Sequence, residues 1–208
     1  MNLKLAVSPP PTRVAIMEQL AGVLRDADAS TTNIESALAR TNVSKEAVTA
    51  EFGGSRQLLV AMVAQLSESM SAPLTDDSSR SELRERLLAF GQRVMDSYAT
   101  SHLRGLYRIA VTEAIRHTGL GRDFYEVGPG RLSQRLADFL QVAQAEGALR
   151  AADPHLLASH FLALLRANVE SANTFPHELA TNPVARAVYV RNAVELFCEG
   201  IDGGTAPC

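Results

Sequence analysis

Apolar residues recur at helical spacing along most of the chain, and the pattern is sharpest between residues 32 and 52. Residues three and four positions apart lie on one face of an α-helix. The apolar positions there fit two short helices, the first with Ile34, Ala37 and Leu38 and the second with Val48 and Phe52. An earlier helix is predicted by the series Ile16, Leu20 and Leu24.

The residues between the two short helices are typical of a tight turn. Asn42 tolerates the left-handed conformation in which helices often end, and the Gly53-Gly54 pair ends the second helix. Ser and Thr hydroxyls at a helix start accept hydrogen bonds from otherwise unpaired backbone N–H groups. The expected N-caps of three successive helices are Thr31 or Thr32, Ser44 and Ser55. We predict a helix-turn-helix, with an ordinary helical hairpin as the alternative.

Beyond residue 56 the same spacing predicts helices only, because no alternating strand pattern is long enough to indicate a sheet. Residues 71–79 are rich in Pro, Asp and Ser, and we expect a loop there. Asp153-Pro154 is a strong helix start, with Asp as the N-cap and Pro at the first helical position. The expected helices span about 58–70, 79–98, 101–118, 121–128, 130–147, 155–175 and 183–200. The predicted fold class is therefore all-α.

With 208 residues and a hydrophobic content of 46%, the chain can bury a substantial core. It carries 20 Lys and Arg against 23 Asp and Glu, so the overall charge does not call for an anionic partner. No apolar run approaches the roughly 20 residues that span a bilayer, and the apolar start is too short for a signal peptide. Cys198 and Cys208 are isolated thiols. We therefore expect a cytoplasmic protein without membrane contact or a disulfide framework.

Catalytic and metal-binding motifs are absent from the sequence. The five histidines form no His-x3-His pair, there is no Cys-x2-Cys, and Gly-x-Ser-x-Gly is missing. Glu113 and His117, four residues apart, fit a solvated pair better than an acid–base couple. We expect no enzymatic activity, no metal and no cofactor.

Three stretches between residues 41 and 59 form a recognisable series: Thr41-Asn42-Val43-Ser44, Phe52-Gly53-Gly54-Ser55-Arg56 and Leu58-Leu59. This series resembles the helix-turn-helix of the TetR family of bacterial regulators. The family pattern is approximately Ala-Gly-Val-Ser, a short recognition helix that carries Tyr, then Phe-Gly-Ser-Lys and a Leu-Leu pair. The C-terminal half resembles the AefR-like subgroup of that family, around Tyr107-Arg108, Glu113-Ala114, Phe124-Tyr125 and Gly128-Pro129-Gly130-Arg131-Leu132.

The resemblance implies a regulator, by default a repressor, that binds a near-palindromic DNA operator as a homodimer. A small apolar effector would release it by favouring a conformer whose recognition helices are wrongly spaced for the duplex. The implied domains are a helix-turn-helix domain over residues 1–56, with 1–11 as a disordered arm, and a ligand-binding and dimerisation domain over 57–203. Residues 204–208 would be a tail.

The expected DNA contacts gather on and around the second helix of the helix-turn-helix. Lys can donate to guanine, Thr can donate or accept, and an alanine methyl can meet the thymine methyl. The candidate residues are Thr32, Ser44, Lys45, Ala47, Thr49, Ala50 and Arg56. Thr49 stands where the family has its Tyr, and Ser55 stands where it has Lys, with Arg56 one place later.

The N-terminal segment is electrically neutral. Up to residue 56 it carries six cations and six acids, and two of the acids, Glu46 and Glu51, lie on the expected reading helix. Much of the affinity of a duplex binder comes from neutralised phosphates. The alternative hypothesis is therefore a TetR-fold protein that has lost DNA binding and acts as a ligand-binding or protein-interaction module.

Two further sites are expected in the C-terminal part. An effector pocket, largely apolar with Tyr98, His102 and Arg108 as polar candidates, would be lined by Met62, Phe90, Val94, Tyr98, His102, Leu106, Ile109, Phe124 and Tyr125. A two-fold interface would use Leu136, Phe139, Leu140 and Val142 on one helix and Leu157, Phe161, Leu164, Leu165 and Val169 on another. The alternatives are an aromatic-rich core for the first set and packing within the subunit for the second.

Overall fold

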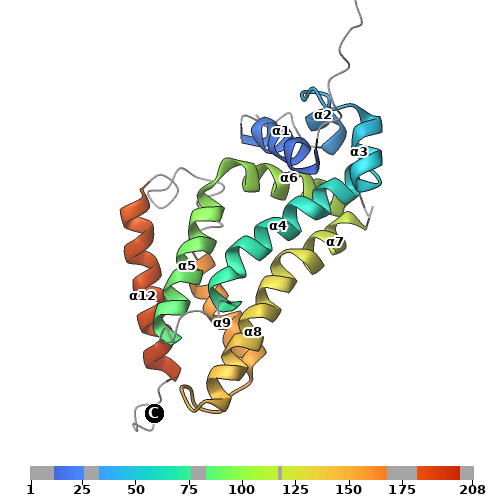
Figure 1. Cartoon of the computed structure of the whole chain (residues 1–208). Coiled ribbons are helices and arrows are strands. Elements are labelled where there is room, and N and C mark those ends of the chain that lie inside the picture. Colours follow the sequence, from blue (N-terminus) through green and yellow to red (C-terminus); the bar gives the residue numbers. More distant parts are fainter. Residues whose placement is uncertain (1–11, 26–32, 76–82, 117–118, 168–181, 202–208) are drawn as a thin grey trace, which may run out of the picture.

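The computed structural model describes residues 12–25, 33–75, 83–116, 119–167 and 182–201, apart from the side chain of Ser101. Every regular element in these ranges is a helix, which confirms the all-α prediction. The helices, labelled as in Figure 1, are α1 (Arg13–Arg25), α2 (Ile34–Leu38), α3 (Lys45–Phe52), α4 (Ser55–Thr75), α5 (Leu83–Ala99), α6 (Ser101–Ile115), α7 (Leu120–Val127), α8 (Pro129–Ala145), α9 (Pro154–Arg166) and α12 (Pro183–Ile201).

Helices α1, α2 and α3 form a small bundle at one end of the molecule (Figure 1). The apolar positions predicted for them are buried, namely Ile16, Leu20, Leu24, Ile34, Ala37, Leu38, Val48 and Phe52. The same cluster takes in Leu58, Leu59 and Met62 of α4, Leu106 and Ile109 of α6, and Leu120 of α7. The helix-turn-helix therefore shares its core with three helices of the body, and its position depends on them.

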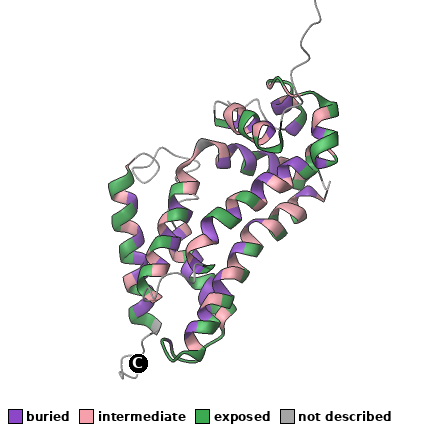
Figure 2. Cartoon of the chain, viewed as in Figure 1, coloured by how far each residue is buried: buried purple, intermediate pink, exposed green. Residues whose placement is uncertain are grey.

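A second buried cluster, the body core, joins α5, α8, α9 and α12 to the C-terminal half of α4. Phe161 of α9 occupies its middle, because its ring centroid lies 6.2 Å from that of Phe90 on α5 and 5.0 Å from that of Phe197 on α12. Gly91 lets α5 and α12 approach closely, since a Cβ there would lie 2.8 Å from a methyl carbon of Val190. The buried residues follow the inner faces of these helices, while exposed residues follow the outer face of α12 (Figure 2).

The helix caps differ from the prediction at two of three positions. The N-cap of α2 is Asn33, whose side chain accepts a hydrogen bond from the Ser36 N–H at 2.8 Å, and not Thr31 or Thr32, which lie outside the described residues. Ser44 caps α3 as predicted, accepting from the Ala47 N–H at 3.1 Å. Ser55 is the first residue of α4, and its hydroxyl donates to the Glu35 carboxylate at 2.8 Å.

The loop predicted for residues 71–79 is wrong over 71–75, because α4 continues through Pro73 to Thr75. Two observations explain the extension. Leu74 is buried in the body core, and Arg86 of α5 donates hydrogen bonds to the carbonyl oxygens of Pro73 and Leu74. The last turn of α4 thus has both an apolar contact and a partner for its carbonyl groups.

Several predictions concern residues outside the described ranges. They include the arm over 1–11, the start of α5 at 79–82, the continuation of α9 to about 175, and the tail over 204–208. The start of α9 is as predicted, with Asp153 accepting from the backbone N–H groups of His155 and Leu156. The division into two domains stays a prediction.

Candidate functional sites

A hydrogen-bonded turn fixes α3 relative to α2. The Thr41 hydroxyl donates to the Leu38 carbonyl at 2.7 Å and accepts from the Val43 N–H at 3.2 Å. At the other end of α3, Gly53 adopts φ +85°, a left-handed conformation that costs glycine little. The helix-turn-helix has a defined start, turn and end.

The outer face of α3 is open to solvent. Lys45, Thr49 and Ala50 are exposed and Ala47 is half-buried. The Thr49 hydroxyl donates to the Lys45 carbonyl at 2.9 Å, while the Ser44 hydroxyl is used as the helix cap. Of the seven predicted DNA contacts, six lie in this region. Five lie on α3 or directly before it, namely Ser44, Lys45, Ala47, Thr49 and Ala50, and Arg56 lies at the start of α4. The seventh, Thr32, lies outside the described residues.

Lys45 and Glu35 form a loose pair beside this face. The Lys45 ammonium lies 4.0 Å from the Glu35 carboxylate, and 85% of the Lys45 side chain is exposed. Glu35 also accepts from the Ser55 hydroxyl, so one acid of α2 faces both α3 and α4. An ion pair this long and this exposed contributes little to stability, and it leaves the lysine able to turn toward a ligand.

Arg56 is held by an acid of the body. Its Nε and Nη2 atoms donate to one carboxylate oxygen of Asp123 on α7, at 2.8 and 2.6 Å. Gly119, at φ +80°, leaves room for this contact, because a Cβ there would lie 3.2 Å from Arg56 Nη2. No short-range pattern predicts the contact with Asp123, since 67 residues separate it from Arg56.

Arg13 ties the start of α1 to the end of α3. Its guanidinium donates to the Glu51 carbonyl at 2.7 Å and lies over the Phe52 ring, with the central carbon 4.2 Å from the ring centroid. A cation over an aromatic face is attracted by the ring quadrupole. Arg13 therefore connects the start of α1 to the C-terminal end of α3.

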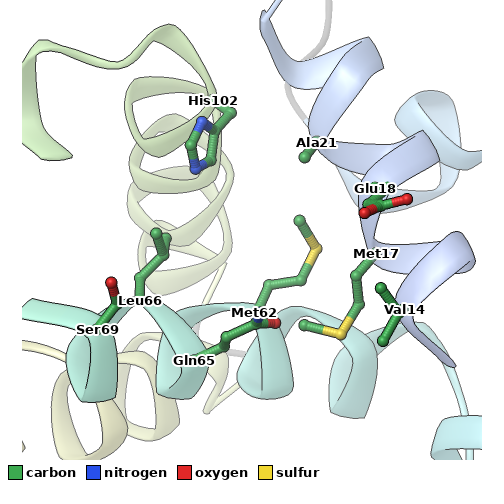
Figure 3. Close-up of a pocket in the computed structure, with 9 residues that line it drawn as sticks. All are labelled: Val14, Met17, Glu18, Ala21, Met62, Gln65, Leu66, Ser69 and His102. Atoms are coloured by element: carbon green, nitrogen blue, oxygen red, sulfur yellow. The ribbon is translucent and has the colours of Figure 1, made fainter.

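A groove of about 240 Å³ lies between α1, α4 and the start of α6 (Figure 3). Its lining consists of Val14, Met17, Glu18, Ala21, Met62, Gln65, Leu66, Ser69 and His102. Burial, together with the nearby Arg25 guanidinium, lowers the pKa of His102 below its ordinary value. The imidazole is therefore mostly neutral at pH 7 and can both donate and accept hydrogen bonds.

Of the predicted pocket residues, the structure brings only Met62 and His102 to this groove. Phe90, Val94, Leu106 and Ile109 are buried in the two cores. Tyr98 and Phe124 are half-buried, Arg108 is exposed, and Tyr125 is 61% exposed. The groove residues of α1 were not predicted from the sequence. The apolar spacing of a helix is the same when it packs only against its neighbours and when it also borders a groove.

The residues predicted for a dimer interface are mostly enclosed by their own subunit. Leu136, Leu140, Leu157, Phe161 and Leu165 belong to the body core, while Phe139 and Leu164 are half-buried against it. Val142 is exposed, and Val169 lies outside the described residues. Burial leaves the five core residues almost no surface for a second copy, as the alternative of packing within the subunit expects.

A different set of apolar side chains is exposed on the last two described helices. Val184, Val188 and Leu196 of α12 are 72%, 49% and 60% exposed, and Leu156 of α9 is 53% exposed. The α12 residues are four and eight positions apart, so they lie along one helical face. Among the described helices, none is long and apolar enough to cross a membrane.

Comparison with known proteins supports the architecture. A family model described as the AefR-like transcriptional repressor, C-terminal domain, matches residues 85–200. A TetR-family regulator from Mesorhizobium loti has a TM-score of 0.69 at 20% identity, covering 91% of this chain and 98% of that one. A TetR-family regulator from Pseudomonas syringae pv. tomato has a TM-score of 0.64 at 24% identity, covering 91% of this chain and 96% of that one. The flavonoid-responsive regulator FrrA has a TM-score of 0.61 at 23% identity, covering 89% of this chain and 96% of its own. No curated protein matches the chain.

The helix-turn-helix shares its core with an all-helical body, and the solved structures have this same fold. The family model covers more than half of the chain and makes the assignment specific. The chain belongs to the TetR family of transcriptional regulators.

Proposed function

We propose that the protein is a repressor that binds a near-palindromic operator as a homodimer and leaves it when a small effector binds. The observation that carries the proposal is the outer face of α3, a short capped helix after a tight turn that exposes Lys45, Thr49 and Ala50. A helix of this kind can enter the major groove and present side chains to base edges.

The proposed dimer uses the exposed apolar face of α12, made by Val184, Val188 and Leu196, with Leu156 of α9 beside it. Two copies of this face would bury these side chains against each other around a two-fold axis. A dimer is needed because a reader of paired half-sites presents two recognition helices about 34 Å apart. This face takes the place of the enclosed residues that the helical pattern had suggested.

The proposed effector site is the groove between α1, α4 and α6. It joins the helix-turn-helix to the body, so a molecule bound there would act on the position of α1. FrrA, which is similar in fold, is a flavonoid-responsive regulator. A regulator of this kind works where the chromosome is, and we propose a cytoplasmic location.

The test is an unbiased selection of genomic fragments by the purified full-length protein at about 50 mM salt, where phosphate contacts are strong. The proposal expects enriched fragments that share an inverted repeat with half-sites about one duplex turn apart. A Lys45→Ala, Thr49→Ala double variant is the matched control, because it changes the outer face of α3 and keeps its cap and buried side. Equal enrichment by the control, or none by the wild type, would contradict the proposal.

A second candidate function is a ligand-binding or protein-interaction module of TetR fold that does not bind DNA. The observation that favours it is the engagement of three cations near the helix-turn-helix by protein oxygens: Arg13 with Glu51, Lys45 with Glu35 and Arg56 with Asp123. The same selection separates the two, because this candidate expects no enriched sequence at any salt concentration.

A further inference from the structure

The groove at the junction of α1, α4 and α6 has the chemistry of a selective site. Met17, Met62 and Leu66 provide an apolar floor, and Glu18, Gln65, Ser69 and His102 provide polar groups around it. Figure 3 shows Glu18 on the α1 side and His102 on the α6 side, with the Met62 side chain extending between them. Methionine side chains adapt their shape and pack well against aromatic rings.

The lining residues carry charge of one sign, and the Arg25 guanidinium lies outside the lining, near His102. Of the nine residues that line the groove, Glu18 is the only one charged at pH 7 when His102 is neutral. Among the described residues, none forms an ion pair with Glu18. A ligand carboxylate beside this acid would be repelled, whereas a ligand ammonium group would be attracted.

We propose that the groove binds a small aromatic amine, with the ring over Met17 and Met62 and the protonated amine beside Glu18. His102 and Ser69, at the opposite end, offer hydrogen bonds to a polar substituent on the ring. The size of the groove, about 240 Å³, suits a one- or two-ring molecule, since sites for larger drug-sized ligands span about 300–1,000 Å³.

The groove lies where a bound molecule would tilt α1. On one side, α1 and α6 are in backbone contact, because a Cβ on Gly105 would lie 3.0 Å from the Leu24 carbonyl oxygen. On the other side, Arg13 joins the start of α1 to the end of α3. A ligand between these two points pushes on the middle of α1 while its C-terminal end is held, so the displacement reaches α3. This step rests on the proposed function, whereas binding itself does not.

The test uses three indole probes that differ mainly in charge: tryptamine, which is cationic, tryptophol, which is neutral, and indole-3-propionate, which is anionic. The full-length protein carries ¹³C-methyl methionine, and single Met17→Leu and Met62→Leu variants assign the two resonances. We expect tryptamine to shift both methyl signals and to bind more tightly than tryptophol, with indole-3-propionate weakest. Met95, buried in α5 within the body core, is the internal control and should not move.

A matched pair of variants tests the role of Glu18. Glu18→Gln should lower the affinity for tryptamine about threefold to fivefold, the effect of one partly solvated ion pair, and leave tryptophol unchanged. Glu146→Gln, which removes an exposed acid beyond the end of α8, should change neither. Absence of shifts at Met17 and Met62, equal affinity for the amine and the carboxylate, or an unchanged Glu18→Gln variant would overturn the proposed site.

Operator binding is measured separately, by fluorescence anisotropy with and without tryptamine. Methyl shifts with an unchanged operator affinity would overturn the coupling of the groove to α3. If the protein bound no operator even without tryptamine, the proposed repressor function would fail, and the methyl shifts would still decide whether the groove is a site.

Discussion

The ion pair between Arg56 and Asp123 makes a sharp prediction about DNA affinity. Arg56 is the cation nearest to the position where the family's helix-turn-helix carries its Lys, and in this structure Asp123 of α7 holds it at 2.6 Å. To reach a phosphate, the guanidinium must leave this carboxylate. The free energy of the pair is therefore subtracted from operator binding, and Asp123→Asn should return most of it.

The magnitude follows from geometry and exposure. Two charge-assisted hydrogen bonds would favour a strong pair, but the Arg56 and Asp123 side chains are 43% and 28% exposed, so solvent screens them. Pairs of this kind contribute up to about 1 kcal/mol. For a dimer, about 1–2 kcal/mol corresponds to an operator affinity about 5- to 30-fold tighter. The free energy of unfolding should fall by about 1 kcal/mol or less per subunit.

The assay is fluorescence anisotropy with a labelled operator at several salt concentrations. When Asp123 no longer holds it, Arg56 can add one phosphate contact per subunit, so the slope of log affinity against log salt should steepen by up to about 0.9 per subunit. Glu126→Gln is the matched control. It removes a carboxylate from the same helix, and the only ion pair described for that acid is with Arg122, at 3.8 Å and well exposed. Its operator affinity should rise much less.

Two results would refute the reasoning. One is an Asp123→Asn variant whose affinity and salt slope both equal those of the wild type. The other is a gain that persists in an Arg56→Ala background, because it would then come from removing a negative charge rather than from releasing this arginine. A double-mutant cycle of the two substitutions measures the coupling directly.

Three further predictions concern other parts of the molecule. Lys45→Ala should weaken operator binding about 3- to 10-fold and reduce the salt slope by about 0.9 per subunit; unchanged anisotropy curves would remove Lys45 from the interface. Val188→Asp should shift the protein from dimer to monomer in sedimentation velocity with its helical circular dichroism retained, and a persistent dimer would place the interface elsewhere. His102 has a folded-state pKa below its unfolded value, so the unfolded chain binds more protons and the wild type should lose stability as pH falls below about 6.5. His102→Gln should flatten that part of the stability profile in denaturant titrations, and an identical slope would contradict the burial argument.

The local signals in the sequence were enough to predict the helices, because each depends on residues a few positions apart. Ser44, Gly53 and Asp153 act at the helix ends as expected from their own chemistry. The failure at Pro73 has a tertiary cause, since Arg86 and the burial of Leu74 stabilise a turn that proline alone would end. A short-range rule cannot include a partner on another helix.

The sites were less predictable for the same reason. Phe161 and Leu136 lie on wide apolar faces, and a wide face can meet either a neighbouring helix or a second subunit with the same sequence pattern. The groove draws on three helices that are far apart in the chain, so its α1 residues carried no signal of their own. Of the predicted pocket residues, Met62, an apolar candidate, and His102, a polar candidate, line the groove.

The neutral net charge of the N-terminal segment has to be considered together with the acids that pair with its cations. A count of cations and acids gives only the net charge of the segment, and a net charge of zero does not attract an anionic ligand. In the structure, Arg56 is paired with an acid from the body rather than from its own segment. Under the proposed function, DNA affinity then depends on the position of α7 as well as on the number of charges. A body conformation that holds Asp123 close should weaken DNA binding, and one that withdraws it should strengthen binding, although the composition of the helix-turn-helix is the same in both.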